Sequence, residues 1–287
     1  MRIRCLQRHD EGYPRLLAQI PDPPARLWLR GDAAPDLLER ACVAIVGARA
    51  CSGYGRAAAR LLSTEATAAG AVVVSGMARG IDGEAHRGAL AARGATVAVL
   101  GCGIDRDYPA AHTRLAGAIV ESGGLVVSEY EPGVEPAPWR FPARNRIIAG
   151  LARATVVVEA RERSGALITA DFALEDGREV LAVPGEITSA LSAGSNALLR
   201  QGATPATCAG DVLEALGLEA RRAEPEIPDD PAAAAVLAAI AGGAATPDGL
   251  TRATGLDAAE LASALALLEL SGAVSLEEGV VRSTIAR

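Results

Sequence analysis

Residues 42–49 read Cys-Val-Ala-Ile-Val-Gly-Ala-Arg, an apolar run, rich in β-branched residues, that leads directly into a glycine turn. A short apolar run of this kind is typical of a strand buried on both faces of a sheet. Similar runs follow at residues 71–74, 95–100, 125–127, 154–158 and 179–183. The alanine- and leucine-rich stretches between them are long enough for helices, and this alternation predicts an α/β fold with a Rossmann-like, doubly wound, mostly parallel sheet.

The residues on either side of this core predict two smaller parts. Residues 1–40 contain a proline cluster and short helical patterns, and we expect a small helical N-terminal region without strands there. The polar, proline-rich segment 221–230 predicts a linker. Residues 231–287 show three helical stretches and a hairpin pattern, which predict a C-terminal winged-helix module. The Rossmann-like domain is then expected at 41–220.

The composition excludes several classes of protein. The 287 residues include no apolar run near the ~18 residues that a membrane span requires, and charges and prolines occupy the place of a signal peptide. The five cysteines are scattered and form no C-x-x-C pair. This pattern favours reduced thiols and a cytoplasmic protein over disulfides, a zinc site or a membrane partner.

The charge distribution says more than the total charge does. The formal net charge is −7, and all 28 basic residues are arginines; the total alone argues against a nucleic-acid partner. Residues 139–163, however, contain six arginines and two acidic residues, together with Trp139 and Phe141. Arginines that contact phosphates, interleaved with rings on which bases stack, favour single-stranded nucleic acid as the ligand. Trp139 is equally compatible with a place in the core.

Most of the predicted strands end in glycine turns, among them those at Gly47, Gly76, Gly80 and Gly165. Ligands of such sheets bind at the carboxyl ends of the strands, where glycines and helix N-termini accept phosphate. The first turn lacks the G-x-G-x-x-G fingerprint and the second strand does not end in an acidic residue, which disfavours a nicotinamide oxidoreductase. Arg49 in the first turn suits a phosphodiester as a bidentate donor.

The sequence shows no catalytic constellation. It contains no G-x-S-x-G, H-E-x-x-H or P-loop motif. His86 follows Asp82 by four residues on a predicted helix, and we expect it to make an internal hydrogen bond. We therefore expect a protein that is not an enzyme and that has no cofactor and no metal site.

The longest helix expected in the winged-helix module covers 257–271. It contains no arginine but two glutamates, Glu260 and Glu269. A DNA-reading helix presents cationic and polar contacts at this place. The pattern therefore favours protein contact or packing for this module.

Several motifs occur in order between residues 42 and 216. They are Val46-Gly-Ala-Arg49, Ser75-Gly-Met-Ala-Arg-Gly-Ile-Asp-Gly-Glu-Ala-His86, Tyr108-Pro109, Phe141-Pro-Ala-Arg-Asn-Arg-Ile-Ile148, Ser164-Gly-Ala-Leu-Ile-Thr169, Pro184-Gly185 and Gly194-Ser-Asn-Ala-Leu198. Together they make the chain resemble the DNA-processing protein A (DprA/Smf) family. The resemblance implies a sequence-independent single-stranded DNA-binding protein that forms a homodimer. It also implies that the protein protects incoming DNA during natural transformation and helps load the RecA recombinase.

The resemblance further implies which residues contact DNA. Arg49 matches a phosphate-contacting position, and Arg144, Asn145 and Arg146 match the family's R-N-R signature. The other candidates are Ser164, Gly165 and Thr169 in the turn that lines the same pocket, Phe141 as a stacking residue, Arg140 as a phosphate contact, and the turn glycines Gly47, Gly76 and Gly80.

An enzyme of the same broad fold is the alternative, namely a nucleotide-phosphate hydrolase of the lysine-decarboxylase-like (cytokinin-activating) type. Members of that type carry a P-G-G-x-G-T-x-x-E turn with a catalytic glutamate. The best counterpart here, residues 164–171, lacks both the glycine pair and the glutamate. Asp171 and Glu175 are the acids that this alternative would have to use.

Overall fold

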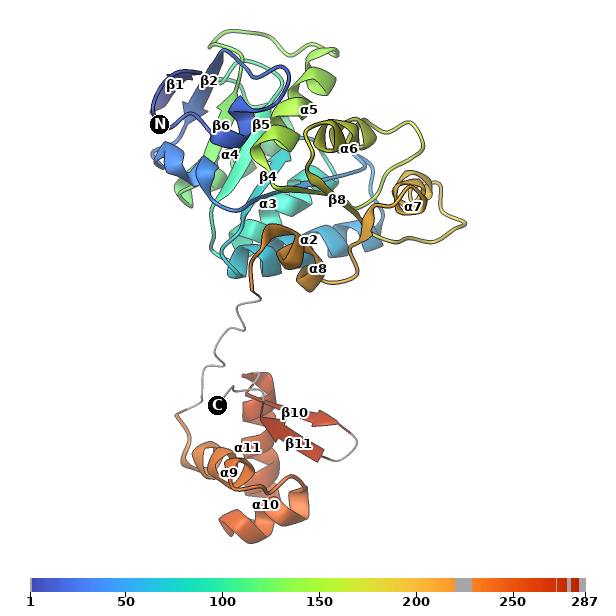
Figure 1. Ribbon diagram of the computed structural model, residues 1–287. Coiled ribbons are helices and arrows are strands. Elements are labelled where there is room, and N and C mark those ends of the chain that lie inside the picture. Colours follow the sequence, from blue (N-terminus) through green and yellow to red (C-terminus); the bar gives the residue numbers. More distant parts are fainter. Residues whose placement is uncertain (1, 220–228, 272, 278–279, 284–287) are drawn as a thin grey trace. The chain divides into compact units, whose positions relative to one another are not determined.

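A nine-stranded sheet runs through the larger of two units into which the chain divides, residues 1–221 and 222–287 (Figure 1). Its strand order is β1-β2-β6-β5-β4-β3-β7-β8-β9. The computed structural model describes residues 2–219, 229–271, 273–277 and 280–283.

The six apolar runs form the centre of this sheet, and their strands are parallel to one another. They are β3 (Cys42–Val46), β4 (Val72–Gly76), β5 (Thr96–Leu100), β6 (Leu125–Ser128), β7 (Ala154–Val157) and β8 (Glu179–Ala182). The short β9 (Thr204–Pro205) pairs with β8. All residues of β3 to β7 are buried, so the predicted doubly wound, mostly parallel sheet is confirmed.

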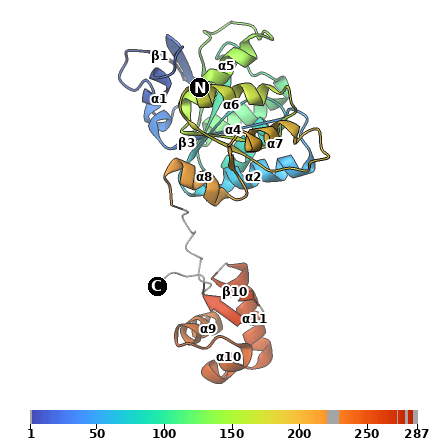
Figure 2. The ribbon, with the colours of Figure 1, turned by 45° about the vertical axis from the view of Figure 1, so that its right-hand side comes forward.

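Helices cover both faces of the sheet (Figures 1 and 2). Val43 and Ile45 of β3 pack in one core with residues of α2 and α3, whereas Ala44 and Val46 pack in another with residues of α5 and α6. The helices of this unit are α1 (Arg15–Ala18), α2 (Gly53–Ala68), α3 (Ile81–Ala91), α4 (Thr113–Glu121), α5 (Arg140–Leu151), α6 (Gly165–Glu175), α7 (Ala193–Arg200) and α8 (Ala209–Leu216), with the 3₁₀ helices η1 (Pro35–Glu39) and η2 (Ala110–His112).

The N-terminal region is not the strand-free helical part that we expected. β1 (Ile3–Gln7) pairs antiparallel with β2 (Arg26–Arg30), and β2 pairs antiparallel with β6. The sequence signal is an alternation: Leu27 and Leu29 are fully buried, whereas Arg26 is exposed. This period of two marks a half-buried strand, and it is easily missed in a five-residue segment that begins and ends with arginine.

The described residues of the smaller unit form three helices and a two-stranded antiparallel sheet, the arrangement predicted for it. The elements are α9 (Pro231–Ala241), α10 (Pro247–Thr254), α11 (Ala258–Leu270), β10 (Val274–Glu277) and β11 (Val280–Ser283). The predicted linker lies, up to residue 228, outside the described residues. Among the helices of the described residues, none has the length and apolar character needed to cross a membrane.

Candidate nucleic-acid interface

The crossovers of the sheet change direction between β3 and β7. β3 connects through α2 to β4 on one side, whereas β7 connects through α6 to β8 on the other. Switch points of this kind form a crevice at the carboxyl ends of the strands, and ligands of α/β proteins bind there. A pocket of about 230 Å³ lies at this position, lined by residues of the β3–α2 turn, α5 and the start of α6. We call it the Arg144 pocket.

Arg144 of α5 gives this pocket a buried positive charge, since only 5% of the residue is exposed. Its guanidinium donates to the main-chain oxygen of Val99, and its Nε lies 3.3 Å from Asn145 Oδ1. Asn145 in turn donates from Nδ2 to the carbonyl oxygen of Gly165 at 3.0 Å, which joins α5 to the first turn of α6. Burial lowers the pKa of Arg144, but a guanidinium keeps its proton in proteins.

Asp82 is the acidic residue that lines the same pocket. It is 7% exposed and accepts a hydrogen bond from the Ala78 N–H at 3.3 Å. Burial raises the pKa of this carboxyl to about 6, against the attraction of Arg144, which lowers it. Asp82 stands within the same motif as Gly76 and Gly80, and this position in the motif is the signal that could have placed it at the site.

The N-terminus of α6 faces the pocket and is open to an anion. The cap residue Ser164 accepts a hydrogen bond from the Ala166 N–H at 3.3 Å, and the space beside Gly165 is empty of protein atoms. The N-terminus of α2 differs, because Glu159 accepts a hydrogen bond from the Ser52 N–H at 2.9 Å and is itself 3% exposed. A buried carboxylate thus occupies the anion position of α2, whereas no carboxylate of the described residues accepts a hydrogen bond from the first N–H groups of α6.

Two exposed arginines, Arg49 and Arg79, lie at the Arg144 pocket or in the pocket next to it. Arg49 lines the Arg144 pocket and also a neighbouring pocket of about 450 Å³, which Arg79 lines as well. We call the second one the Tyr108 pocket. Within the described part of the chain, neither guanidinium forms a hydrogen bond or pairs with a carboxylate. Arg79 was not among the predicted contacts, although it too stands in the motif that contains Gly76 and Gly80.

Phe141 lines both pockets. Its ring stacks with that of Tyr108, with the ring centroids 5.2 Å apart and the planes at 22°. The Arg49 guanidinium carbon lies 5.7 Å from the Phe141 centroid. Tyr108 is 45% exposed and belongs to the Tyr108-Pro109 motif.

Trp139 and Arg140 lie outside the residues that line these two pockets. Trp139 is 64% exposed, so the interpretation as a core residue is wrong. The guanidinium carbon of Arg140 lies 4.8 Å from the centroid of the Trp139 ring and 4.9 Å from that of the Tyr130 ring. Arg140 also donates to the main-chain oxygen of Glu135. Arg140 is thus held by its neighbours beside the site.

The predicted turn glycines are required for close packing within the protein. A Cβ on Gly47 would lie 2.7 Å from Ile81 Cγ1, and a Cβ on Gly80 would overlap the main chain of the β3–α2 turn. Gly80 also has a φ of +79°, which favours glycine. Gly47 lines the Arg144 pocket, as does the buried Thr169.

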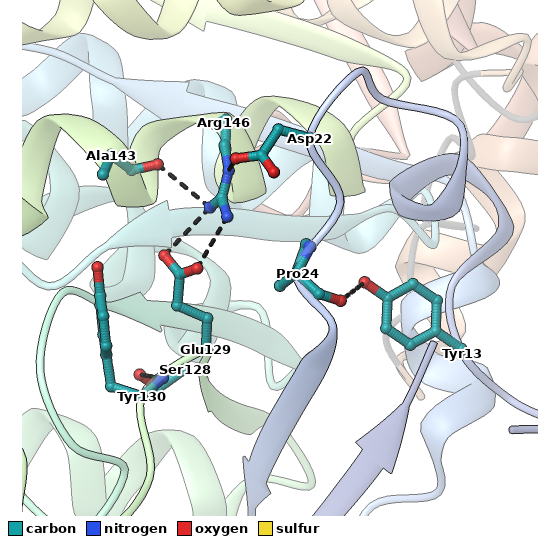
Figure 3. Close-up of polar contacts among 8 residues, drawn as sticks. All are labelled: Tyr13, Asp22, Pro24, Ser128, Glu129, Tyr130, Ala143 and Arg146. Atoms are coloured by element: carbon teal, nitrogen blue, oxygen red, sulfur yellow. Dashed lines mark hydrogen bonds and ion pairs between the residues drawn. The ribbon is translucent and has the colours of Figure 1, made fainter. Parts of the chain in front are cut away.

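Arg146 is not among the residues that line the pocket, and its guanidinium lies between Glu129 and Asp22 (Figure 3). Its terminal nitrogens lie 3.1 and 2.8 Å from the two carboxylate oxygens of Glu129, and its Nε lies 2.9 Å from Asp22 Oδ2. Asp22 belongs to the N-terminal region, so Arg146 fastens that region to α5 and to the end of β6. A guanidinium already bound by two carboxylates is less able to bind phosphate, so we propose a structural role for Arg146 in place of the DNA contact that the resemblance implies.

Two further expectations concern catalysis. The internal hydrogen bond of His86 is confirmed: the ring is fully buried, with Nε2 2.8 Å from the Gly76 oxygen and Nδ1 2.8 Å from the Thr96 hydroxyl. Asp171 is exposed and lines a separate hollow beside α7, and Glu175 is exposed. The acids that the hydrolase alternative would use therefore lie outside the Arg144 pocket.

Comparison with protein families matches both units. Residues 4–217 match the family described as DNA recombination-mediator protein A, and residues 220–279 match the DprA winged helix domain. The chain is 47% identical over 208 residues to the DNA processing protein DprA of Streptococcus pneumoniae, covering 71% of each protein. It is 44% identical over 207 residues to Protein Smf of Escherichia coli, covering 72% of this chain and 55% of that protein.

Comparison with solved structures also gives DNA processing proteins. The X-ray structure of DprA from Streptococcus pneumoniae matches with a TM-score of 0.69 and 44% identity over 74% of each chain. A structure of DNA processing protein A from Helicobacter pylori, described for its single-stranded DNA binding mode, matches with a TM-score of 0.67 and 30% identity. That match covers 75% of this chain and 95% of the other.

Proposed function

The chain belongs to the DNA recombination-mediator protein A (DprA/Smf) family, and from this premise we propose that the Arg144 pocket binds a backbone phosphate of single-stranded DNA. One observation carries the proposal. A buried guanidinium, an open helix N-terminus and two uncompensated arginines converge on one crevice beside the ring of Phe141. The single-stranded DNA binding described for the relative from Helicobacter pylori supports it.

The phosphate is held by charge and by hydrogen bonds. Nη2 of Arg144 has no hydrogen-bond partner among the described residues and donates to one phosphate oxygen. The N–H of Gly165 and the dipole of α6 act on another, with the side chains of Ser164, Thr169 and Asn145 lining the pocket. Arg49 and Arg79 attract the neighbouring phosphates. No bond is made or broken, so we propose a binding protein and not an enzyme.

We propose a single strand as the ligand because the ring of Phe141 at the pocket can stack only with unpaired bases. In a duplex the faces of each base are covered by its neighbours, whereas a single strand can stack its bases on protein rings. Phe141 lies directly beside the phosphate position. Stacking and phosphate contacts tolerate any sequence, which gives sequence-independent binding.

The finer biological role follows the family resemblance. We propose that the protein acts in the cytoplasm as a homodimer, protects DNA entering the cell during natural transformation and helps load RecA. The winged-helix unit contacts protein in this scheme, since the described residues of α11 include no arginine but do include Glu260 and Glu269. RecA-dependent ATP hydrolysis on single-stranded DNA, measured with and without this protein, tests the loading step.

A salt series with single- and double-stranded oligonucleotides of equal length tests the proposed binding. We expect tighter binding to the single strand, with the logarithm of the affinity falling by about 0.7 per logarithmic unit of salt for each phosphate contacted. Equal affinity for both forms would contradict the proposal. Release of free base from a nucleoside monophosphate would instead support the hydrolase alternative.

The variant Arg49→Ala/Arg144→Ala tests the site itself. Each hydrogen bond to a charged group contributes about 1.5–3 kcal/mol, so the double variant should lose about 100-fold or more in affinity. Arg40→Ala/Arg153→Ala is the matched control, because it also removes two arginines. Arg40 and Arg153 lie just before β3 and β7 in the sequence. They are therefore at the amino ends of these strands, whereas the pocket is at the carboxyl ends. Equal losses in the two variants would place the phosphate elsewhere.

A further inference from the structure

Arg30 is a buried charge in the N-terminal region. It is the last residue of β2, and its side chain is 9% exposed. A buried charge lowers stability unless another group pairs with it. The guanidinium has one hydrogen-bond partner among the described residues, since its Nη2 lies 2.5 Å from Asp107 Oδ1 and its buried Nε has no partner. This ion pair joins β2 to the segment that follows β5, although β6 separates the two strands in the sheet.

Asp107 immediately precedes Tyr108, whose ring stacks on that of Phe141. The start of the segment 101–109 is fixed without Arg30, because Ile104 is fully buried and the Gly103 N–H donates to a main-chain oxygen at 2.8 Å. Its end is fixed differently. Among residues 107–109, Asp107 alone forms a side-chain hydrogen bond to a described residue. The place of the Tyr108 ring therefore depends on the ion pair of Asp107.

We propose that Arg30, acting through Asp107, positions the ring of Tyr108 and with it the ring of Phe141 at the Arg144 pocket; this inference rests on the proposed single-stranded DNA binding. Phe141 lines that pocket and lies against Tyr108. Arg30 itself is too deeply buried to contact DNA. It is therefore a positioning residue, and it makes β2 of the N-terminal region part of the support of the Arg144 pocket.

Asp107→Asn gives the decisive test, because positioning and electrostatics predict opposite results. The substitution removes a negative charge next to Tyr108 and leaves the charge of Arg30 uncompensated, so electrostatics alone would strengthen the binding of a polyanion. Loss of the ion pair releases Tyr108 instead. We therefore expect Asp107→Asn to bind an oligothymidylate at least about fivefold more weakly, the lower end of what one stacked base contributes. Arg30→Gln should lose as much, and the double variant no more than either single variant.

The salt dependence separates positioning from direct contact with the strand. A lost phosphate contact reduces the slope of the logarithm of affinity against the logarithm of salt by about 0.7. Neither Arg30 nor Asp107 contacts phosphate in this proposal, so Arg30→Gln and Asp107→Asn should keep the slope of the wild type. A smaller slope in Arg30→Gln would mean that Arg30 binds the strand itself, and it would overturn the inference.

Two variants serve as controls. Glu131→Gln also removes an acid, and Glu131 is exposed with a carboxylate that has no hydrogen-bond partner among the described residues; it should bind as tightly as the wild type or more tightly. Arg146→Ala also loosens the N-terminal region, since Arg146 binds Asp22, but it should keep the affinity. Urea unfolding of each variant verifies that the affinities belong to folded protein.

The outcomes for the inference and for the proposed function differ. Unchanged or tighter binding by Asp107→Asn would overturn the inference, as would equal losses of affinity in Arg30→Gln and Arg146→Ala, which would mean a general effect of loosening the N-terminal region. The proposed function fails in another way, if the wild-type protein does not bind the oligothymidylate.

Discussion

Asp82 and Arg144 meet above Gly76 at the inner end of the Arg144 pocket. A Cβ on Gly76 would overlap Asp82 Oδ2 and would lie 2.7 Å from Nη2 of Arg144. Both side chains are buried; burial raises the pKa of Asp82 and lowers that of Arg144, and the attraction between the two opposes both shifts. The phosphate site is therefore sensitive both to the size of residue 76 and to the charge of residue 82.

Gly76→Ala should impair both stability and DNA binding. The added methyl group forces Asp82 and Arg144 apart in a packed interior, and overpacking of this kind costs about 1–3 kcal/mol of the free energy of unfolding. Binding should weaken because Arg144 Nη2 moves. Urea unfolding and a binding titration measure the two effects. Gly117→Ala on α4 is the control, because the space beside it is open; normal binding by Gly76→Ala would show that residue 76 does not set the position of Arg144.

DNA binding should strengthen as the pH falls through about 6. The pKa of Asp82 is raised to about 6 by burial, so the carboxyl is charged at pH 8, where it offsets Arg144 and repels phosphate. Below the pKa it is neutral, and the full charge of Arg144 acts on the ligand. Dissociation constants between pH 5 and 8 at constant ionic strength measure this effect.

Asp82→Asn is the control for that pH dependence. It should bind at pH 8 about as tightly as the wild type does at pH 5, with a flat profile between. His86 does not contribute to the wild-type slope over most of this range, since burial lowers its pKa to about 4. A wild-type slope that persists in Asp82→Asn would show that another group is responsible.

The sequence was sufficient for the central strands because their residues are buried on both faces and need apolar side chains throughout. It was not sufficient for β2, where an arginine, Arg30, is buried together with Leu27 and Leu29. The pocket residues Arg144, Asn145 and Ser164 were likewise predictable from motifs. Arg146 was not, since Glu129 and Asp22, which hold it, lie 17 and 124 residues away in the sequence.

Arg146→Ala should lower stability and leave the DNA affinity of the folded protein unchanged. The substitution removes the guanidinium that binds the Glu129 carboxylate, which is 16% exposed, and the loss of a partner from a largely buried polar group costs about 1–3 kcal/mol. Urea unfolding measures the loss, and Arg153→Ala is the control for removal of one arginine. A large loss of affinity with unchanged stability would return Arg146 to the DNA interface.

Removal of residues 222–287 should leave the affinity for single-stranded DNA unchanged. Every residue that we assign to DNA contact lies in the unit 1–221, and residues 222–287 contain more acidic than basic residues. A binding titration of the truncated and full chains makes the comparison. Weaker binding by the truncated chain would mean that the winged-helix unit contacts DNA after all.

His86 should make the folded protein sensitive to acid. Its folded pKa is about 4 because the ring is buried, whereas the pKa in the unfolded chain is about 6.5. Between these values the unfolded chain binds a proton that the folded chain does not, so stability is lost as the pH falls from about 6.5 to 4, by roughly 3 kcal/mol in total.

Asp82 acts in the opposite direction, since its raised pKa makes the folded chain bind the proton first. The difference between wild type and His86→Gln therefore isolates His86: the variant is less stable at pH 7.5 but should lose less of its melting temperature on going to pH 5. If the melting temperatures of the two proteins fell in parallel with pH, folding would not lower the pKa of His86.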